Sequence, residues 1–303
     1  MKYIEYKTID STNNEAKRLI NEGKIAEPTC LSAKEQTAGR GRQGKSFFSP
    51  DTGLYMTVVF PVNCPISSQV TMTTRTACAV ADAIEECTGK DVGIKWVNDI
   101  YTDGKKCCGI LCEAVNDYEQ GRMKFIVIGI GINVYTKEWP DDLKDIAGSL
   151  FNEEVNQGDG SLIDLRQMPR RSVRHGSTVC LSPTKTRPVT KRWSGLAPVI
   201  DSLKNRIAET LDDWLFNVPG DKFITYYKSH SIVLGKNITF IENGETREGT
   251  AIDIDENGGL VVEAENKYKD EPLENNIAKD MERIPIERKR RILSSGEISV
   301  RTQ

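Results

Sequence analysis

Residues 39–60 read GRGRQGKSFFSPDTGLYMTVVF, a glycine- and arginine-rich loop followed by an apolar run. The first six residues match the dinucleotide-binding fingerprint G-x-G-x-x-G. That fingerprint must open a helix, so that the helix N-terminus faces a pyrophosphate. Here Phe47–Pro50 lead instead into Leu54–Phe60, whose β-branched and aromatic residues favour a buried strand. The stretch therefore predicts a loop between two strands and argues against a doubly wound dinucleotide-binding fold.

The segments on either side of this stretch predict two helices and one more strand. Thr12–Glu15 has the form of a capping box, so a helix should begin at Ser11-Thr12-Asn13 and stop at Gly23. The apolar run Thr29–Ala33 favours the strand that precedes the loop. Val70–Cys87 is rich in alanine with periodic apolar residues, which indicates a helix that covers a sheet.

Three strand candidates follow that helix: Val92–Val97, Lys106–Val115 and Met123–Val134. Turn chemistry at Asp103-Gly104 and at Asn116-Asp117 separates them and suits short hairpins. Because parallel strands need long crossover connections, these short connections favour an antiparallel or mixed sheet.

The last part of the chain predicts a closing helix and a small β module. Apolar residues recur every four positions in the helix, at Leu203, Ile207, Leu211 and Leu215. Beyond Gly235, Asn-Gly pairs join three strand candidates: Asn237–Glu242, Thr246–Ile254 and Leu260–Glu265. We therefore predict an α/β (α+β) protein. A mixed sheet with flanking helices should occupy residues 1–230, and a small β-barrel or sandwich should occupy residues 231–303.

The composition is that of an ordinary globular protein. Hydrophobic residues make up 38% of the 303 residues and charged residues 28%, and the formal net charge is -3. This balance gives no reason to expect nucleic-acid or membrane binding. The N-terminus lacks an apolar signal-peptide core and no run of about 18 apolar residues occurs, so we expect a cytoplasmic protein. The eight cysteines contain no C-x-x-C pair and should be reduced, mostly buried thiols.

Two segments do not fit the surrounding pattern, and both are interpreted as surface insertions. The first covers residues 156–199 and is basic: eight lysines or arginines, four prolines and no acidic residue lie between Leu165 and Ile200. The second covers residues 267–291, which are highly charged and lack an apolar face.

Four stretches carry side chains suited to chemistry. Gly39–Gly44 combines flexibility with the positive charge of two arginines, which suits closure over a phosphate-bearing ligand, although a solvated basic turn has the same pattern. Lys95–Asp99 ends a strand with a cation, an amide and a carboxylate, as a site or a surface turn would. Lys106 enters an apolar strand, where it could stabilise developing negative charge or simply extend to solvent. Gly129 and Gly131 interrupt another apolar strand, for which the usual reason is the close approach of a ligand or of another backbone.

Taken together and in this order, the four stretches resemble the biotin protein ligase family, the biotin–acetyl-CoA-carboxylase ligases. The resemblance rests on GRGRQG followed by a strand, then K-W-x-N-D, K-x-x-G-I-L and G-x-G-I-N, and covers about residues 8–152 and 200–265 plus residues 296–301. Most members have proline where Val97 stands, which leaves every charged group in place. The resemblance implies a mixed-sheet domain that binds biotin and ATP, followed by a small SH3-like barrel.

The resemblance also implies roles for individual residues. The biotin-binding residues would be Ser11, Thr12, Gln36, Gly39, Arg40, Arg42, Lys106, Gly109 and Gly129. The nucleotide-binding residues would be Arg40, Arg42, Asn98 and Asn133. The catalytic residues would be Lys106, Arg42, Lys95 and Asp99, with Asp99 also a ligand for Mg²⁺. The expected reaction forms biotinyl-5′-AMP from biotin and ATP, then transfers biotin to a lysine of a biotin carboxyl carrier domain.

Some alternatives remain at this point. A lipoate or octanoate ligase or transferase would share the architecture, and a non-catalytic nucleic-acid-binding protein could use the basic stretch Arg166–Arg192. Family members that repress transcription carry a helix-turn-helix domain before the first helix, whereas ten residues precede Ser11 here, so we expect the monofunctional type without specific DNA binding. A homodimer formed through an exposed sheet edge stays open.

Overall fold

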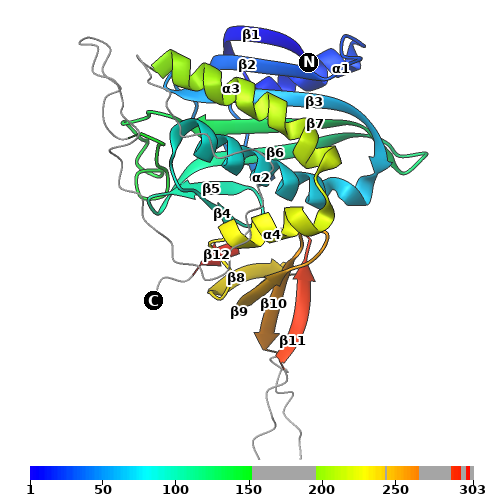
Figure 1. Cartoon of the computed structure of the whole chain (residues 1–303), viewed down its shortest axis with the longest axis vertical. Helices are drawn as coiled ribbons and strands as arrows, with labels where there is room; N and C mark the ends of the chain where they lie inside the picture. Colours follow the sequence, from blue (N-terminus) through cyan, green and yellow to red (C-terminus); the bar gives the residue numbers. More distant parts are fainter. Residues whose placement is uncertain (152–195, 243, 266–287, 295–297, 301–303) are drawn as a thin grey trace, which may run out of the picture. The chain divides into compact units, whose positions relative to one another are not determined.

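A computed structural model of the chain describes residues 1–151, 196–242, 244–265, 288–294 and 298–300 (Figure 1). The chain divides into two compact units, residues 1–232 and residues 233–303. None of the described helices is long and apolar enough to cross a membrane.

The first unit is built on a seven-stranded mixed sheet (Figure 1). Its strands are β1 (Lys2–Ile9), β2 (Thr29–Gln36), β3 (Gly53–Pro65), β4 (Gly93–Lys95), β5 (Asp99–Thr102), β6 (Lys105–Asp117) and β7 (Arg122–Asn133). Their order across the sheet is β1-β2-β3-β7-β6-β5-β4. Strands β1 and β2 are parallel, and all other neighbours are antiparallel. The predicted mixed sheet is therefore confirmed.

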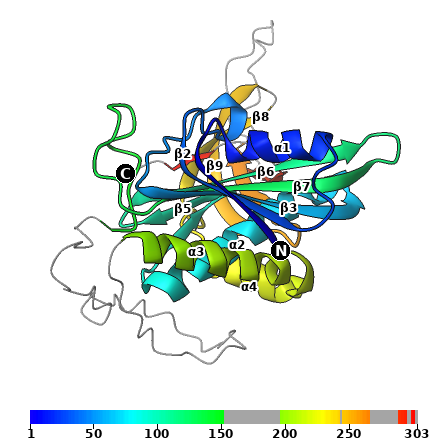
Figure 2. The ribbon, with the colours of Figure 1, turned by 90° about the horizontal axis from the view of Figure 1, so that it is seen from above.

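Helices cover the two sides of this sheet unequally. They are α1 (Thr12–Asn21), α2 (Gln69–Thr88), α3 (Leu196–Asp212) and α4 (Gly220–His230), with short turns of other helix types at Arg42–Gly44, Ile66–Ser68 and Asp213–Asn217. Helix α1 lies alone on one side of the sheet, and α2, α3 and α4 lie on the other (Figure 2). The two sides are called the α1 side and the three-helix side below.

The side chains of strand β7 point alternately to the three-helix side and to the α1 side of the sheet. Ile128, Ile130 and Ile132 stand opposite Cys112, Ile110 and Cys108 of β6, and all six side chains are buried. A hydrogen bond from Gln69 Nε2 at the start of α2 to Cys112 O ties this layer to the three-helix side. Gly129 and Gly131 face the α1 side, because successive side chains of a strand point to opposite faces. The layer formed by these six residues therefore belongs to the core on the three-helix side. On the α1 side a second buried apolar cluster packs against α1, and the two glycines open the sheet next to it; the cluster consists of Ala16, Ile25, Leu31, Val59 and Val127.

The three-helix side is assembled as its apolar spacing predicts. The closing helix is α3, whose first residue is Leu196, and Leu203, Ile207, Leu211 and Leu215 are all buried. Helix α2 buries its alanines and ends at Gly89, whose φ of 68° is the left-handed conformation that glycine adopts most readily. Seven cysteines are described; they are free thiols, and six of them are buried. Burial raises the pKa of Cys107 to about 12, so this thiol is unreactive at neutral pH.

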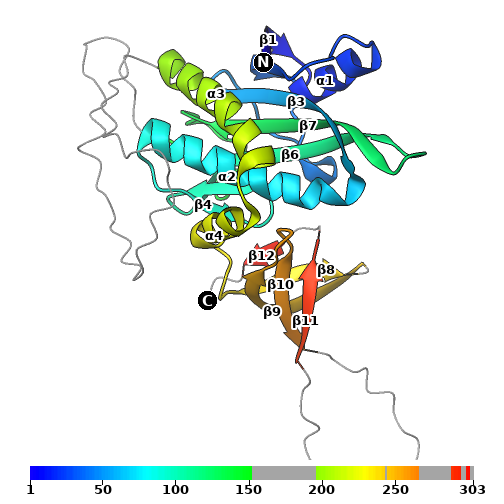
Figure 3. The same cartoon turned by 45° about the vertical axis from the view of Figure 1, so that its right-hand side comes forward.

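The second unit is a small antiparallel sheet in the order β11-β10-β9-β8-β12 (Figure 3). Its strands are β8 (Asn237–Glu242), β9 (Glu245–Ile254), β10 (Leu260–Glu265), β11 (Arg288–Leu293) and β12 (Ile298–Val300). Strands β8, β9 and β10 match the three predicted strands to within one residue. The prediction of a small β domain is therefore confirmed. The connection between β9 and β10 contains Gly258 with φ 87°, as the Asn257-Gly258 signal requires.

Several sequence predictions were wrong in detail. Residues 196–199, assigned to the first insertion, belong to helix α3, where Val199 is buried. Residues 288–291, assigned to the second insertion, form part of strand β11 and pair with β10. The hairpin turn expected at Asn116-Asp117 lies later, because β6 continues to Asp117 and Gly121 takes φ 62°. The rest of both proposed insertions lies outside the described residues.

Strands β1 and β5 and helix α4 were not predicted. Strand β1 is at the edge of the sheet and mostly exposed, so it lacks a strong apolar pattern. Strand β5 is four residues long and lies between the candidates Val92–Val97 and Lys106–Val115, neither of which included it. Helix α4 buries only Phe223 and Tyr227, whose spacing of four residues was the available signal.

Candidate functional site

The Gly39–Gly44 loop folds back on itself as a small hairpin between β2 and β3. Phe47 N donates to Gly39 O at 2.9 Å, and Gly41 N donates to Lys45 O at 2.7 Å. Gln43 with φ 52° and Gly44 with φ 77° form the tip. At the neck, a Cβ atom on Gly39 would lie 2.4 Å from Phe47 O, so only glycine fits without a shift. The loop leads into a strand, as predicted, and not into the helix that a dinucleotide-binding fingerprint requires.

The two arginines of the loop have different anchors. Arg40 donates to Asn14 Oδ1 at 3.0 Å and lies 3.4 Å from a carboxylate oxygen of Glu113. Arg42 donates to Asn98 Oδ1 at 3.0 Å. Arg40 therefore connects the loop to α1 and β6, whereas Arg42 connects it to the K-W-x-N-D segment. This brings together two of the sequence motifs.

A chain of hydroxyl and amide groups runs from α1 across the sheet. Thr12 N and Thr12 Oγ1 lie 2.9 and 3.1 Å from Gln36 Oε1, and Gln36 Nε2 donates to Ser49 Oγ at 3.0 Å. Thr57 Oγ1 lies 2.7 Å from Thr12 Oγ1 and 2.6 Å from Asn13 Oδ1. We call these five residues, Thr12, Asn13, Gln36, Ser49 and Thr57, the polar relay. Hydroxyls can donate and accept, so the polar relay can adapt to a ligand that presents both N–H and C=O groups.

The polar relay corrects the predicted capping box. Helix α1 has Ser11 as its N-cap, and no side chain caps it. The Thr12 side chain bonds to Gln36 of strand β2 instead of to the first turn of its own helix. Ser11 is 2% exposed and Thr12 3% exposed, so both lie inside the unit at the place where α1 meets the sheet.

The strand glycines make room for side chains. A Cβ atom on Gly129 would lie 2.3 Å from Asn13 Oδ1. Gly131 and Gly109 are paired across β7 and β6, and Cβ atoms there would lie 2.6 and 3.0 Å from ring carbons of Phe47. The sequence predicted the close approach of a ligand or of another backbone to Gly129 and Gly131. In the structure, the side chain of Asn13 lies against Gly129 and that of Phe47 lies against Gly131.

The charged end of the site is the ion pair between Lys106 and Asp99, whose atoms Nζ and Oδ1 are 2.7 Å apart. Lys106 Nζ is 3.4 Å from the position that a Cβ atom on Gly109 would take. Lys95 stands opposite Asp99 in the β4–β5 pair, and its Nζ lies 5.8 Å from the centre of the Tyr101 ring. Burial, followed by the charge of Asp99, raises the pKa of Tyr101 to about 12, so its hydroxyl stays protonated and able to donate.

The two predicted asparagines differ in how they are held. Asn98 is fixed on both sides of its amide, because Nδ2 donates to Ile110 O at 2.7 Å and Oδ1 accepts from Arg42. Asn133 is 3% exposed, and its Oδ1 finds no hydrogen-bond partner among the described residues. Because a buried acceptor without a partner is costly, a ligand that donates to Asn133 would remove that cost.

Sequence reasoning missed five members of this site: Asn13, Phe47, Ser49, Thr57 and Glu113. Each had a signal in the sequence. Thr57 is the threonine in the apolar run Leu54–Phe60, and Glu113 is the carboxylate in the apolar part of β6. Asn13 adjoins Thr12, and Phe47 and Ser49 lie in the segment that follows the Gly39–Gly44 loop.

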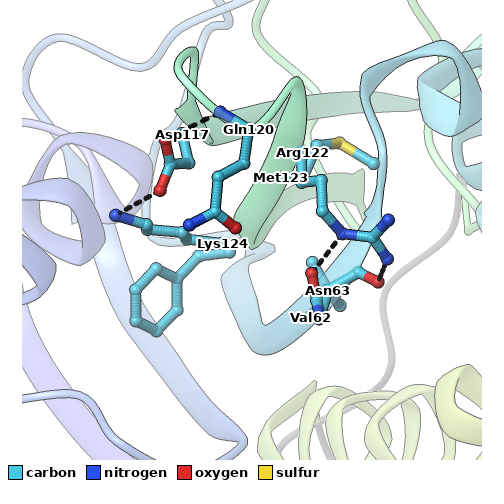
Figure 4. Close-up of a pocket in the computed structure, with 8 residues that line it drawn as sticks. Val62, Asn63, Asp117, Gln120, Arg122, Met123 and Lys124 are labelled. Carbon is cyan, nitrogen blue, oxygen red and sulfur yellow. Dashed lines mark hydrogen bonds and ion pairs between the residues drawn. The ribbon is translucent and has the colours of Figure 1, made fainter.

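A hollow of about 440 Å³ lies elsewhere, at the end of the β6–β7 hairpin (Figure 4). Its charged residues already have partners: Lys124 pairs with Asp117 at 2.9 Å, and the Arg122 side chain donates to Asn63 (Figure 4). None of the predicted site residues lines it. The hollow is open, with both polar and apolar residues in its lining, and it is separate from the site that the glycine loop covers.

Comparisons with known proteins agree with this geometry. Residues 5–133 match the profile of the biotin/lipoate A/B protein ligase family, and residues 233–301 match that of the biotin protein ligase C-terminal domain. The bifunctional ligase/repressor BirA of Bacillus subtilis is 38% identical over 164 residues, which are 53% of this chain and 48% of that protein. The chain thus spans about half the length of the first curated relatives it matches.

Two further proteins resemble the chain over more of its length. The biotin–acetyl-CoA-carboxylase ligase of Mycobacterium tuberculosis is 24% identical over 84% of this chain and 80% of its own length. The crystal structure of the biotin protein ligase from Aquifex aeolicus, in complex with biotin and ATP, superimposes with a TM-score of 0.62 at 23% identity. It covers 100% of this chain and 99% of that one, which shows that the fold is shared.

Proposed function

The chain belongs to the biotin protein ligase family, and on this premise we propose that it is an ATP-dependent ligase that forms biotinyl-5′-AMP and transfers biotin to a lysine of a carrier domain. The observation that supports the proposal most is the Arg42–Asn98 hydrogen bond. It places the glycine loop over a sheet face with the polar relay at one end and the Lys106–Asp99 pair at the other. An uncharged polar ring of a ligand could form hydrogen bonds with the polar relay, and an anionic group at its other end could bind to the ammonium of Lys106.

The polar relay is the proposed site for the ureido ring of biotin. A ureido group presents two N–H donors and one carbonyl acceptor, so its partners must both accept and donate. Thr12 and Gln36 supply these groups, and Ser11 adjoins them. Gly109 and Gly129 are proposed to line the biotin pocket, where they let the side chains of Phe47 and Asn13 lie close to the sheet. Gly39 keeps the loop close to Gln36 and Phe47.

The first chemical step joins two anions. The biotin carboxylate attacks the α-phosphorus of ATP, a P–O bond to the β-phosphate breaks, and pyrophosphate leaves. Lys106 and Arg42 are the cations proposed to offset the negative charge that develops, and Lys95 and Arg40 add positive charge nearby. Asn98 and Asn133 are the proposed nucleotide contacts, since the buried Asn133 Oδ1 can accept a hydrogen bond from a ligand.

Magnesium fits this site as an ion held mainly by phosphates. The ion commonly takes one or two protein carboxylates together with phosphate oxygens. Asp99 offers one carboxylate, at present paired with Lys106, and the described residues contain no group of three or more His, Cys, Asp or Glu side chains that could hold a metal. Asp99 is therefore the proposed protein ligand, and bound Mg²⁺ would neutralise phosphate charge.

The second step transfers the biotinyl group. A carrier lysine amine attacks the carbonyl carbon of the mixed anhydride, the amide bond forms, and AMP leaves. The mixed anhydride reacts with water, so the loop must stay closed until the carrier arrives. We assign biotin and ATP binding to residues 1–230 and the smaller β domain to residues 231–303. A cytoplasmic location, a biotin carboxyl carrier partner and no specific DNA target complete the proposal.

The experiment that tests the function uses the intact chain with a purified biotin carboxyl carrier domain. We expect mass spectrometry to find one biotinyl group on a carrier lysine when ATP and Mg²⁺ are present. Lipoate and octanoate are the matched controls, because the first profile also includes lipoate ligases. Transfer of lipoate or octanoate in place of biotin would make the chain a ligase of the other branch. Absence of any transfer would refute the proposed activity.

A further inference from the structure

Glu113 stands where three parts of the site meet. It lies on strand β6 opposite Val127, two residues beyond Leu111, which is paired with Gly129. The position places it on the α1 side of the sheet. Its side chain is 23% exposed. A partly buried carboxylate in an apolar strand needs partners, because the charged form is costly to remove from water.

One oxygen of the Glu113 carboxylate holds the polar relay. Asn13 Nδ2 donates to Glu113 Oε2 at 3.0 Å and to Leu111 O at 3.4 Å. With both donors directed to β6, the amide oxygen of Asn13 must face Thr57 and Gly129. The Thr57 hydroxyl in turn contacts Thr12. Glu113 thereby sets the orientation of the side chains that lead to the proposed ureido contacts.

The other oxygen of the carboxylate holds the loop. Glu113 Oε1 lies 2.9 Å from Lys17 Nζ and 3.4 Å from Arg40 Nη1. Arg40 also donates to Asn14, so the first arginine of the loop is attached to both α1 and β6. Burial by itself raises the pKa of Glu113, but the hydrogen bonds from Lys17 and Asn13 and the charges of Lys17 and Arg40 lower it overall, so the group is ionised at neutral pH.

We propose that Glu113 is a positioning residue of the biotin subsite: through Asn13 it orients the polar relay, and through Arg40 it holds the Gly39–Gly44 loop against α1. The inference rests on the proposed function only where it names the ligand as biotin. Lys106 lies near the opposite end of β6 from Glu113. Loss of the Glu113 charge should therefore weaken biotin binding far more than it slows the chemical step.

The test compares Glu113→Gln with Asp117→Asn. Glutamine keeps the shape of Glu113 but removes its charge and places a donor where only an acceptor fits. Asp117 is the matched control, because it is another carboxylate of β6 with a lysine partner, Lys124, at the hairpin end. Two quantities are measured: hydrogen exchange of the loop amides without ligand, and KM and kcat for biotin in ATP–pyrophosphate exchange.

For Glu113→Gln we expect faster exchange at Gly39–Gly44 and a rise of about tenfold in the biotin KM, the size expected for losing a charged hydrogen bond. We expect kcat to change by less than about twofold. Asp117→Asn should match the wild type in both measurements. Should Glu113→Gln fail to fold, Arg40→Gln removes the Glu113–Arg40 contact from an exposed residue, together with the Arg40–Asn14 hydrogen bond, and should loosen the loop at least as much.

A folded Glu113→Gln protein whose loop exchanges like that of the wild type overturns the inference. So does a fall in kcat at an unchanged biotin KM. If the wild type itself shows no biotin-dependent exchange, the proposed function fails, whereas the ligand-free loop measurement still decides whether Glu113 holds the loop. The two failures are therefore distinguishable.

Discussion

Strand β7 has two unlike faces within the five consecutive residues Ile128–Ile132. Ile128, Ile130 and Ile132 face the three-helix side, where they are buried against β3 and β6 neighbours that are also apolar. Gly129 and Gly131 face the α1 side, where Asn13 and Phe47 occupy the space that larger side chains would fill. From Ile128 to Ile132, one face of the strand is part of the apolar core and the other face carries the site, while Val127 just before them is buried in the apolar cluster on the α1 side.

The difference between the isoleucine face and the glycine face indicates which side of the sheet carries the function. Isoleucine in a strand buries apolar surface, and a fully buried one contributes about 1.5–3 kcal/mol. Glycine there has no side chain to bury and weakens the strand. On the α1 side the glycines bury no apolar side chain, and this side carries the polar relay, the Gly39–Gly44 loop and the Lys106–Asp99 pair. Substitutions should therefore affect stability on one face and activity on the other.

The largest effect is expected at Lys106. Replacing it with methionine keeps a long apolar stem and removes the ammonium that is 2.7 Å from Asp99. Loss of a preorganised charge typically costs about 10²–10³ in kcat, so biotin-dependent pyrophosphate exchange should slow by that factor. The neighbouring Lys105 is the matched control, because its Nζ donates to the Lys144 carbonyl and Lys105→Met should keep near-parental exchange. Near-parental exchange by a folded Lys106→Met protein would remove Lys106 from the site.

The next effect contrasts the two faces directly, with Gly129→Ala and Ile130→Val. The alanine Cβ would lie 2.3 Å from Asn13 Oδ1, so Asn13 must move and the polar relay must break. We expect the biotin KM of Gly129→Ala to rise by at least about tenfold, the cost of a displaced hydrogen-bond partner. Ile130→Val should lower the free energy of unfolding by about 0.5–1.5 kcal/mol and leave KM unchanged. If Gly129→Ala and Ile130→Val changed the biotin KM equally, the two faces of β7 would not differ in their effect on activity.

A smaller effect is expected in the backbone of the Gly39–Gly44 loop. Biotin offers the ureido ring and ATP offers the phosphates, so only the two together, or the adenylate, engage both ends of the site. Hydrogen exchange in the loop should slow with both ligands and stay nearly unchanged with either alone. The three-helix side, for example the amides of α2, should not respond. A loop that is equally protected with and without ligands has no gating role.

The smallest effect belongs to the three-helix side and concerns stability alone. His230 Nε2 lies 3.3 Å from Glu85 Oε1, its Nδ1 lies 2.9 Å from Tyr226 O, and its ring stacks on that of Tyr226 at 4.0 Å. Burial alone lowers the pKa of His230, but Glu85 with the Tyr226 carbonyl and the charge of Asp82 raise it above 6.5 overall. The stabilisation is therefore complete below pH 6.5 and is lost as the pH rises through the folded-state value.

The measurement for His230 is the free energy of unfolding from about pH 6 to pH 9, compared with that of His230→Gln. The wild type should lose up to about 1 kcal/mol relative to the variant as the pH rises, the size of a partly exposed ion pair. His175 lies outside the described residues, and the comparison with the variant cancels its contribution. A stabilisation of the wild type over the variant that grows with rising pH would contradict the raised pKa of His230. Pyrophosphate exchange should be the same in both proteins.

The two faces also explain what the sequence could and could not predict. The three-helix side follows from periodicity: α2, the spacing from Leu203 to Leu215 and the apolar strands were all predicted because buried residues repeat with the period of their element. Strand β1 and helix α4 were missed, because edge elements bury few residues and leave a weak pattern.

The site was partly predictable, since the residues that break a pattern are visible in the sequence. Gly129, Lys106 and the arginines of the loop stood out because glycines or charges interrupt apolar or turn segments. Their partners did not stand out. Asn13 and Glu113 are 100 positions apart in the chain, and only the sheet and α1 bring them to 3.0 Å. Which residue fills the space above a glycine depends on tertiary structure, and no local pattern encodes it.

The central claim is that the α1 side of the sheet, beneath the glycine loop, activates biotin with ATP. The most direct measurement is ATP–pyrophosphate exchange by the intact chain in the absence of any carrier protein, because it isolates the first step from the choice of acceptor. We expect exchange that requires biotin and that lipoate or octanoate does not support. ATP–pyrophosphate exchange that does not depend on biotin, or the absence of exchange in a folded protein, would contradict the central claim.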